Sequence, residues 1–306
     1  MTRTVTYRTP AKVNLCLLVG PREETGLHRL FTVFVPVELY DEIEFCLDVQ
    51  PGIARPGLLD VRCSVAPGEA NLVAKALRAL EQSTGYSFIG RVTIQKHIPE
   101  AAGLGGGSSD AGLSLRVGAQ LIAEAGGPVL GSAGLVDLAR QVGADVAFFL
   151  DPRPMIGRGV GEILEPVTLP AMGLVLVLVG ATLSTAQVYS LYDRLVAHGE
   201  LTSFSARAER AERRWRAVAQ AKEVASLLEN DLERAAFALV PSLAADREMI
   251  VREGALGAAM SGSGPTLFGV CESAAQAQEV ARRLVRRGLS AVASRVVLPA
   301  ADRSAR

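Results

Sequence analysis

The chain has 306 residues, of which 49% are hydrophobic and 21% charged, a composition typical of globular proteins that excludes intrinsic disorder. Lysine and arginine together number 32, as do aspartate and glutamate, so the formal net charge is zero. A nucleic-acid-binding protein usually has a basic excess, and we therefore expect no nucleic-acid partner. This length suits two domains better than a single core.

No targeting or membrane segment is visible. Residues 1–10 are polar, and the most apolar run, 172–179, is far shorter than the roughly twenty residues that a membrane span needs. The four cysteines are scattered without a CxxC pair, and the three histidines share no metal-ligand spacing. We therefore expect a cytoplasmic protein with reduced thiols, no membrane association and no structural zinc site.

Period-two alternation dominates the first half of the chain, with helical spacing in three places. One or two strands, broken by Pro10, are predicted at 4–20, and further strands at 30–39, 41–49, 58–65 and 90–98. Helices are predicted at 71–82, at 108–125 after a glycine-rich turn, and at 134–142. This order of strands followed by interleaved helices and strands favours an α+β fold with largely antiparallel sheets.

The stretch 151–170 is rich in turn residues and indicates a domain boundary, so we predict one domain over 1–162 and another over 163–306. Beyond it we predict a buried strand at 172–179, a charged helix over 206–228, a helix at 274–287 and a strand at 290–297. Five arginines between 206 and 216 indicate a solvated helix face, with phosphate binding as the alternative.

The sharpest transition is the run Gly103-Leu104-Gly105-Gly106-Gly107-Ser108-Ser109 before a helix. Glycines let the backbone approach an anion closely, and the N–H groups of a helix start point at that anion. The hydroxyls of the two serines can donate to phosphate oxygens or ligate Mg²⁺. We interpret the run as a phosphate-binding loop, the alternative being a flexible turn with a serine cap. It is no Walker A loop, because no lysine follows the last glycine.

Three other segments carry polar side chains in apolar surroundings. Lys12 and Asn14 are two residues apart, so in a strand they point to the same face; the alternative is an exposed Lys12 and an edge position for Asn14. Asp145 stands within an apolar run, where a buried carboxylate needs a partner or a function, so it is either catalytic or a helix cap. A second glycine/serine loop, 260–266, precedes an apolar strand.

These segments occur in the order of the GHMP kinases (galactokinase, homoserine kinase, mevalonate kinase and relatives), which the chain resembles over roughly residues 8–298. The motifs that carry the resemblance are Pro10-Ala11-Lys12-Val13-Asn14-Leu15, Gly26-Leu27-His28, Asn71-Leu72-Val73, Gly103 to Asp110, Gly143-Ala144-Asp145, Gly159-Val160-Gly161-Glu162-Ile163-Leu164, Asn230-Asp231-Leu232 and Met260-Ser261-Gly262-Ser263-Gly264. Together they are most similar to the branch that phosphorylates the 2-hydroxyl of a cytidylyl methylerythritol in non-mevalonate isoprenoid synthesis.

The resemblance implies a two-domain GHMP kinase fold with the active site in the inter-domain cleft, and ATP and Mg²⁺ as cofactors. It implies that Asp145 is the base toward the substrate hydroxyl, and that Lys12 orients Asp145 and stabilises the transferring phosphoryl group. The residues implied at ATP are Asn71, Lys96, Gly103, Leu104, Gly105, Gly106, Gly107, Ser108 and Ser109. No residue is implied as a metal ligand, and we expect a monomer or a weak homodimer.

At the substrate, the resemblance implies contacts from Asn14, Leu27, His28, Thr185, Tyr189, Gly262 and Ser263. His28 would read the edge of the cytosine, and Tyr189 falls where the family places an aromatic ring against it. The family usually has tyrosine where this chain has Leu27, which can cover a base by apolar contact but cannot stack. It also often has proline at the position of Ala147, which affects only a turn.

Two alternatives remain open from the sequence. One is another GHMP kinase that acts on mevalonate or homoserine, and His28 with Tyr189 favours a cytidylyl substrate instead. The other is a protein of the same fold that binds a ligand without catalysis. The presence of both Lys12 and Asp145 speaks against this second alternative.

Overall fold

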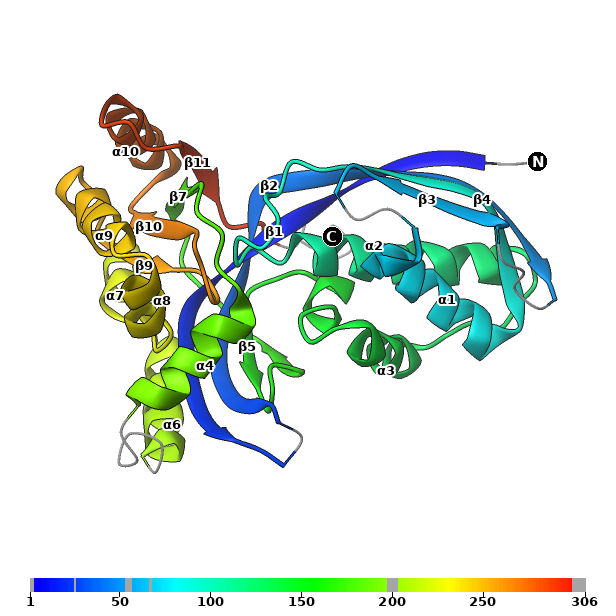
Figure 1. Ribbon diagram of the computed structural model, residues 1–306, viewed down its shortest axis with the longest axis horizontal. Coiled ribbons are helices and arrows are strands. Elements are labelled where there is room, and N and C mark those ends of the chain that lie inside the picture. The colour runs from blue at the N-terminus through cyan, green and yellow to red at the C-terminus, as the bar shows by residue number, and fades with distance from the viewer. Residues whose placement is uncertain (1–2, 25, 53–56, 66–67, 197–202, 299–306) are drawn as a thin grey trace, which may run out of the picture. The chain divides into compact units, whose positions relative to one another are not determined.

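The computed structural model describes residues 3–24, 26–52, 57–65, 68–196 and 203–298, and within them helices and strands are mixed along the chain (Figure 1). The chain divides into two compact units, each discontinuous in sequence. The first unit is Met1–Ala11, Leu39–Ile98 and Gly105–Pro152, and the second is Lys12–Glu38, Pro99–Leu104 and Arg153–Arg306. The predicted division at 162/163 stays a prediction, as does an active site in the inter-domain cleft.

Among the described residues the larger sheet has seven strands, in the order β3-β4-β2-β1-β8, with β5 paired to β2 and β6 paired to β5. Their bounds are β1 Arg3–Arg22, β2 His28–Pro51, β3 Leu59–Cys63, β4 Tyr86–Gln95, β5 Met155–Arg158, β6 Ile163–Pro166 and β8 Glu229–Asn230. Strand β2 pairs with β4 and β5 in the antiparallel sense, whereas β3–β4 and β1–β8 are parallel. The unit boundaries divide β1 after Ala11 and β2 after Glu38.

Two strand predictions were wrong in the same way, because both strands are longer than expected. Pro10 does not interrupt β1, and the strands predicted at 30–39 and 41–49 are one strand, β2. Strand β8 pairs with β1 only at Cys16 and Leu17. Within the described residues, Pro10 therefore has no partner strand on the side of β1 that faces away from β2. A proline is tolerated there, because its missing N–H breaks no ladder on that side.

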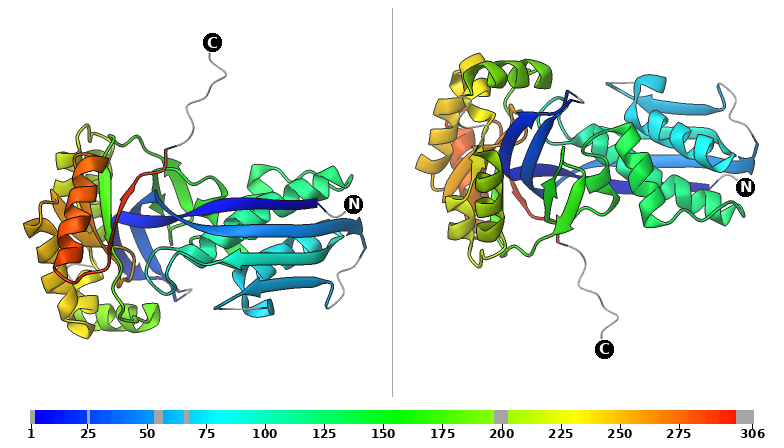
Figure 2. Two further views of the ribbon diagram at one scale, coloured as in Figure 1. Left: turned by 90° about the horizontal axis from the view of Figure 1, so that it is seen from above. Right: turned by 90° about the horizontal axis from the view of Figure 1, so that it is seen from below.

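In the first unit, helices α1 (Leu72–Thr84), α2 (Gly106–Glu124) and α3 (Ser132–Val142) lie on one face of the strands (Figures 1 and 2). All three correspond to predicted helices. Helices α1 and α2 pack closely because Gly118 has no side chain: a Cβ there would lie 2.7 Å from Leu80 Cδ1 and 3.0 Å from Leu77 Cδ2. The first unit thus forms a two-layer core that holds the start of α2 in place.

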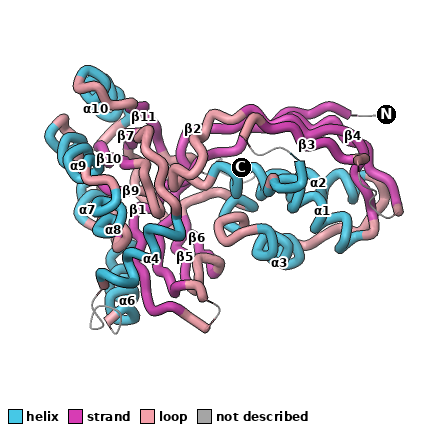
Figure 3. The backbone as a smooth tube through the Cα atoms, viewed as in Figure 1, coloured by secondary structure: helices cyan, strands magenta, loops and turns pink. Residues whose placement is uncertain are grey.

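The second unit contains a four-stranded antiparallel sheet in the order β11-β7-β10-β9, with α7, α9 and α10 packed on it (Figure 3). The bounds are β7 Gly173–Val177, β9 Gly257–Met260, β10 Leu267–Cys271, β11 Ala291–Arg295, α4 Thr185–Leu195, α6 Phe204–Trp215, α7 Ala221–Ser226, α8 Glu233–Leu239, α9 Ser242–Arg252 and α10 Ala274–Arg286. Every residue of β7 and β10 is buried, as the apolar run at 172–179 predicted for β7. Two short 3₁₀ helices, η1 (Gly68–Ala70) and η2 (Ala147–Leu150), belong to the first unit.

The charged helix predicted over 206–228 was wrong in extent, because α6 ends at Trp215 and a separate helix, α7, follows at Ala221. Trp215 is 1% exposed and anchors the end of α6 in the core. Two of the arginines are ion-paired: Arg207 with Glu229 and Asp231, and Arg216 with Glu165 and Glu212, which favours the solvated-face interpretation. No helix in the described part of the chain has the length and apolar character needed to span a membrane.

Candidate active site

Lys12 and Asn14 lie on one face of β1, as their spacing predicted. Lys12 Nζ donates to Asn14 Oδ1 at 2.6 Å, and the two residues are only 4% and 3% exposed, which rules out the alternative of an exposed lysine. Asn14 Nδ2 donates in turn to Thr32 Oγ1 at 2.8 Å, and that hydroxyl donates to the Cys16 carbonyl. The amide is therefore fixed with its oxygen toward the ammonium group.

The 260–266 loop lies directly over this pair. Gly262 has φ of +57°, and a Cβ on it would lie 3.3 Å from Lys12 Nζ and 3.5 Å from Asn14 Oδ1. Asn230 holds the loop in shape, because its Nδ2 donates to the carbonyls of Met260 at 2.7 Å and Gly262 at 2.8 Å. The structure thus brings together Lys12, Asn14 and Gly262 from three distant parts of the sequence.

The same loop also contacts the first residues of the predicted phosphate-binding run. Ser261 Oγ donates to the Gly103 carbonyl at 2.8 Å, and a Cβ on Gly103 would lie 2.1 Å from the Ser261 carbonyl oxygen. The backbone N–H of Lys12 donates to the Leu104 carbonyl at 2.9 Å. Gly103 is therefore required by close backbone approach as well as by its φ of +75°.

The start of α2 carries the rest of the run and is open at its N-terminus. Gly105 is the N-cap residue with φ of +70° and offers no side chain to the helix. The N–H groups of Gly106, Gly107 and Ser108 have no hydrogen-bond partner among the described residues. Three orphan donors and the positive end of the helix dipole form a site suited to an anion.

The two serines of the run differ in their roles. Ser109 is fully buried: its Oγ donates to the Pro10 carbonyl at 2.6 Å and lies 2.6 Å from Thr9 Oγ1, so it ties α2 to β1. Ser108 is partly exposed, and its hydroxyl has no partner among the residues that the structure describes. Of the two hydroxyls, that of Ser108 is the one available to a ligand.

Lys96 lies beside the start of α2, within 3.1 Å of where a Gly106 Cβ would be. Its ammonium bonds to Asp41 and, at 2.8 Å, to Asp110 Oδ2, and Asp41 Oδ1 accepts from the N–H groups of His97 and Ile98. Burial would lower the pKa of Lys96, but the two carboxylates outweigh it and raise that pKa.

Of the three charged residues Lys96, Asp41 and Asp110, Asp110 is the one whose ionised form is destabilised. Burial raises the pKa of Asp110 to about 7; Lys96 opposes that shift, and the charge on Asp41 adds to it. Asp110 Oδ1 is buried without a hydrogen-bond partner among the described residues, so the ionised form is poorly solvated. Two carboxylates share one ammonium group, so the group of three has excess negative charge when both are ionised. Protonation of Asp110 removes that excess, which is why its pKa is raised.

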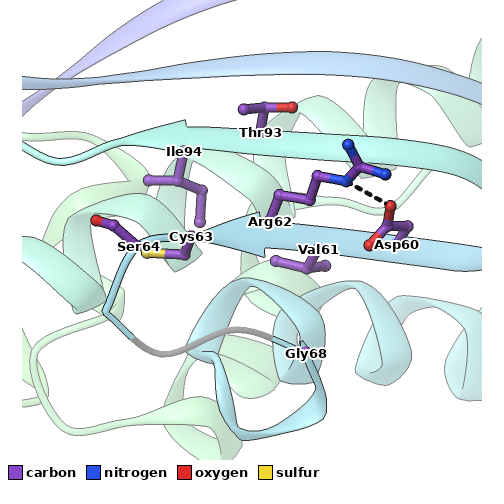
Figure 4. A pocket seen from close by; sticks show the side chains of 8 residues that line it. All are labelled: Asp60, Val61, Arg62, Cys63, Ser64, Gly68, Thr93 and Ile94. Carbon is purple, nitrogen blue, oxygen red and sulfur yellow. Dashed lines mark hydrogen bonds and ion pairs between the residues drawn. The ribbon is translucent and has the colours of Figure 1, made fainter.

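The first unit also contains Asn71, one of the residues predicted at ATP, and a pocket beside β3 and β4. Asn71 is the N-cap of α1, where its Oδ1 accepts from the Val73 N–H at 2.8 Å. A pocket of about 550 Å³ lies between β3 and the end of β4; Figure 4 shows the Arg62–Asp60 hydrogen bond at one side of it and Cys63, Ser64 and Ile94 at the other. The lining residues are Asp60, Val61, Arg62, Cys63, Ser64, Gly68, Thr93 and Ile94.

Asp145 occupies the turn between α3 and η2. It is partly buried, less so than its apolar neighbours predicted, whereas Val146 to Phe149 are buried. The N-cap position of η2 is Val146, one residue after Asp145, and the choice between a catalytic and a capping role for Asp145 stays a prediction. Lys12 belongs to the second unit and Asp145 to the first, so the predicted pairing of the two stays a prediction.

The residues predicted at the substrate fall into two groups within the second unit. His28 is buried at the start of β2, with the Tyr189 ring 5.1 Å from its own, and Leu27 beside it is 53% exposed. Thr185 Oγ1, at the start of α4, lies 2.9 Å from Ser263 Oγ in the 260–266 loop. Tyr189 is partly buried and packs on the apolar core, so it has both a core contact and a solvent-exposed portion.

Sequence reasoning assigned no role to five polar residues that organise these groups, although Asp110 and Ser261 lie within motifs that carried the resemblance; the five are Thr32, Asp41, Asp110, Asp193 and Ser261. Asp41 and Asp110 gave a weak signal, since each is an acidic residue next to an apolar segment. Thr32 lies within an apolar strand without any such signal. Their importance comes from partners 14 to 247 residues away, which no local pattern shows.

Comparison with known proteins identifies similar families and sequences. The family model described as GHMP kinases N terminal domain matches residues 71–151, and the one described as GHMP kinases C terminal matches residues 206–290. The 4-diphosphocytidyl-2-C-methyl-D-erythritol kinase of Thermobifida fusca is 38% identical, covering 92% of this chain and 91% of its own. That of Pelobacter propionicus is 36% identical, covering 92% and 95%.

A solved structure gives the same result. The crystal structure of a 4-(cytidine 5'-diphospho)-2C-methyl-D-erythritol kinase has a TM-score of 0.70 and 33% identity, covering 95% of this chain and 99% of that one. The fold and both domain matches define the class of protein as a GHMP kinase, a small-molecule kinase that uses ATP. Within that class, the chain belongs to the family of the 4-diphosphocytidyl-2-C-methyl-D-erythritol kinases. The prediction of this family and of its α+β fold is confirmed.

Proposed function

We propose that this protein transfers the γ-phosphoryl group of ATP to the 2-hydroxyl of 4-diphosphocytidyl-2-C-methyl-D-erythritol. The observation that carries the proposal is the open start of α2, where the N–H groups of Gly106, Gly107 and Ser108 have no partner among the described residues. Such a helix start binds phosphate groups. The membership of the family supplies the identity of the substrate.

ATP would bind with its phosphates at this helix start. The loop residues Gly103 to Ser109 shape the backbone around the phosphates, and Lys96 lies beside Gly106 as a nearby cation. The adenosine would lie toward Asn71 and the pocket of Figure 4, since the lining residues Gly68 and Ile94 precede Asn71 and Lys96 closely in the chain. The apolar flank of that pocket, with Ile94, suits a purine ring.

The reacting end of the substrate would meet Lys12 and Asp145. Asp145 accepts the proton of the 2-hydroxyl as that oxygen attacks the γ-phosphorus. Lys12 stabilises the charge on the phosphoryl oxygens, and Asn14 holds its ammonium in place through the 2.6 Å hydrogen bond. Positioning and electrostatics supply most of the catalysis in phosphoryl transfer, and the burial of Lys12 and Asn14 serves both.

The cytidylyl end would bind in the second unit. His28 reads the edge of the cytosine and Tyr189 packs against the base, with the exposed Leu27 covering it by apolar contact. Thr185, Gly262 and Ser263 would contact the remainder of the substrate, and the Thr185–Ser263 hydrogen bond already aligns two of these groups.

Mg²⁺ is the expected metal, and the residues present fit it. Mg²⁺ prefers oxygen ligands and commonly takes most of them from phosphates and water. No cluster of three histidine, cysteine or acidic side chains suited to a metal exists in the described residues, and Ser108 offers an available hydroxyl at the phosphate site. Ser108 would therefore be a ligand, and the bound ion would neutralise charge on the phosphates. A cytoplasmic location and a monomer or weak homodimer stay predictions.

An assay of ADP release with three candidate substrates tests the proposal. We expect ADP release with 4-diphosphocytidyl-2-C-methyl-D-erythritol and none above background with mevalonate or homoserine. Turnover of either of these in preference to the cytidylyl compound would refute the proposed substrate. The absence of ADP release with all three substrates would refute the function itself.

A further inference from the structure

Three side chains of helix α4 lie close to the imidazole of His28. The ring of Tyr189 lies 5.1 Å away at a tilt of 33°, and the ring of Tyr192 lies 6.2 Å away edge-on. Asp193 Oδ1 lies 2.7 Å from His28 Nε2. The imidazole is 7% exposed, so α4 fixes both its position and the direction in which each nitrogen points.

The contact with Asp193 determines which nitrogen of the imidazole carries the proton. An ionised carboxylate can only accept, so Nε2 must be the N–H donor, and Nδ1 of the neutral ring is then an acceptor. Among the described residues Nδ1 has no hydrogen-bond partner, and it is not one of the buried unsatisfied atoms, so it reaches space that a ligand can occupy. By holding the proton on Nε2, the Asp193 carboxylate thus leaves the lone pair of Nδ1 available at that point.

We infer that Asp193 is a positioning residue that makes His28 select an amino-bearing pyrimidine over a carbonyl-bearing one. The exocyclic amine of cytosine donates to Nδ1, whereas uracil presents a carbonyl oxygen to the same lone pair, and two acceptors repel. This inference rests on the proposed function, in which His28 reads the base. It adds to that function the residue Asp193, which fixes the tautomer with which His28 recognises the base.

Asp193 can orient His28 without being needed for the packing of α4. Its side chain is 36% exposed, whereas Tyr192 next to it is buried and ties α4 to β1 through its hydroxyl, which donates to the Val19 carbonyl at 2.7 Å. Asp193 follows Tyr189 by four residues, which puts ring and carboxylate on the same face of α4. Removing the carboxylate should therefore alter His28 and leave the helix docked.

The first arm of the test measures the tautomer of His28 by ¹⁵N NMR of histidine-labelled protein, at about pH 8.5, above the ordinary histidine range. The chain has only three histidines, and His28→Gln assigns the signal. We expect the Nε2–H form in the wild type and in Asp193→Asn, whose amide oxygen still accepts, and a tautomer mixture in Asp193→Ala. Arg194→Ala, on the same helix, is the matched control and should leave the signal unchanged. An unchanged tautomer in Asp193→Ala would overturn the inference.

The second arm compares kcat/KM for cytidylyl and uridylyl methylerythritol diphosphates. Asp193→Ala should reduce the preference for cytosine by roughly tenfold or more, chiefly through KM, while Asp193→Asn and Arg194→Ala keep most of it. A preference that survives intact in Asp193→Ala would also overturn the inference. A wild type that turns over neither compound would refute the proposed function instead, and the NMR arm would still decide whether Asp193 controls His28.

Discussion

At the scale of single residues, the candidate site depends on side chains whose neighbours fix their orientation. Lys12 is held by Asn14, Asn14 by Thr32, and Lys96 by Asp41 and Asp110. The same-face placement of Lys12 and Asn14 could be predicted, since it follows from the two-residue period of a strand. The partners Thr32 and Asp41 could not, because their contacts depend on the register between strands far apart in sequence.

The first prediction at this scale concerns the base. Asp145→Asn should leave the fold intact and lower kcat by roughly 10²- to 10⁴-fold, because the amide cannot accept the hydroxyl proton. Asp137→Asn, on the exposed surface of α3, is the matched control and should keep full activity. Steady-state kinetics measures both, and wild-type turnover in Asp145→Asn would remove Asp145 from the mechanism.

The second residue-scale prediction concerns stability against pH. Asp110 has a folded-state pKa of about 7, above its ordinary value of 3.8, so the folded state binds the proton more tightly than the unfolded state. The stabilisation is complete below the unfolded pKa and is lost as pH rises through the folded pKa. From about pH 5 to pH 8, this group should reduce the free energy of unfolding by roughly 2–3 kcal/mol.

Urea unfolding at several pH values measures this effect, and Asp110→Asn is the comparison. The variant carries a neutral, nearly isosteric side chain and should lack that part of the pH dependence. Identical pH profiles for the wild type and Asp110→Asn would show that Asp110 is ionised throughout the range, contrary to this account.

At the scale of elements, the start of α2 is where the sequence was most informative. A run of glycines before a helical apolar pattern predicts a positive-φ turn and open N–H groups, and Gly103 and Gly105 have φ of +75° and +70°. The division of roles between Ser108 and Ser109 could not be predicted, because it depends on which of them faces β1. The single strands β1 and β2 were also missed, since Pro10 and the polar residues near 40 resemble strand ends.

The element-scale prediction uses Gly107, which lies inside α2 with no strain. A Cβ there would meet only Leu72 Cδ1 at 3.5 Å, so Gly107→Ala should raise the stability of the fold by roughly 0.5–1 kcal/mol. The added methyl group should nevertheless weaken binding of a non-hydrolysable ATP analogue by about tenfold, because it obstructs the approach of the phosphates.

Gly134→Ala is the control for this prediction. Gly134 lies in α3, where an added Cβ meets only Leu130 at 3.9 Å, so the same gain in stability should come with unchanged nucleotide affinity. Thermal unfolding and calorimetric titration measure the two quantities. Equal nucleotide affinity in both variants would mean that the α2 start is only a turn.

At the scale of the whole molecule, the chain forms two compact units, and each draws on separated segments. Composition and element order predicted the α+β class and two bodies. They could not predict that β1 and β2 each contribute to both units, because local patterns carry no information on which unit a strand residue joins. The second unit has an apolar core to which β1, β7, β9, β10, α4, α8, α9 and α10 contribute, and it also buries Trp215, the only tryptophan of the chain.

The prediction at this scale concerns the buried side chain of Trp215 in the second unit. Trp215 ends α6 and is 1% exposed, so Trp215→Ala should lower the free energy of unfolding by about 3–5 kcal/mol through the cavity it leaves. Val129→Ala is the control, because Val129 is 83% exposed and should contribute little. Circular dichroism during urea unfolding measures both, and a cost for Trp215→Ala as small as that for Val129→Ala would contradict the assigned packing.

The central claim is transfer of a phosphoryl group to the 2-hydroxyl of the cytidylyl substrate, and ³¹P NMR of the product tests it most directly. The 2-carbon carries a methyl group and no hydrogen, so a phosphate on its oxygen has no three-bond coupling to a proton. With ATP, Mg²⁺ and 4-diphosphocytidyl-2-C-methyl-D-erythritol, we predict a new phosphomonoester signal without proton coupling, equal in amount to the ADP formed. A proton-coupled phosphomonoester, or ADP formed without any new ester, would contradict the account.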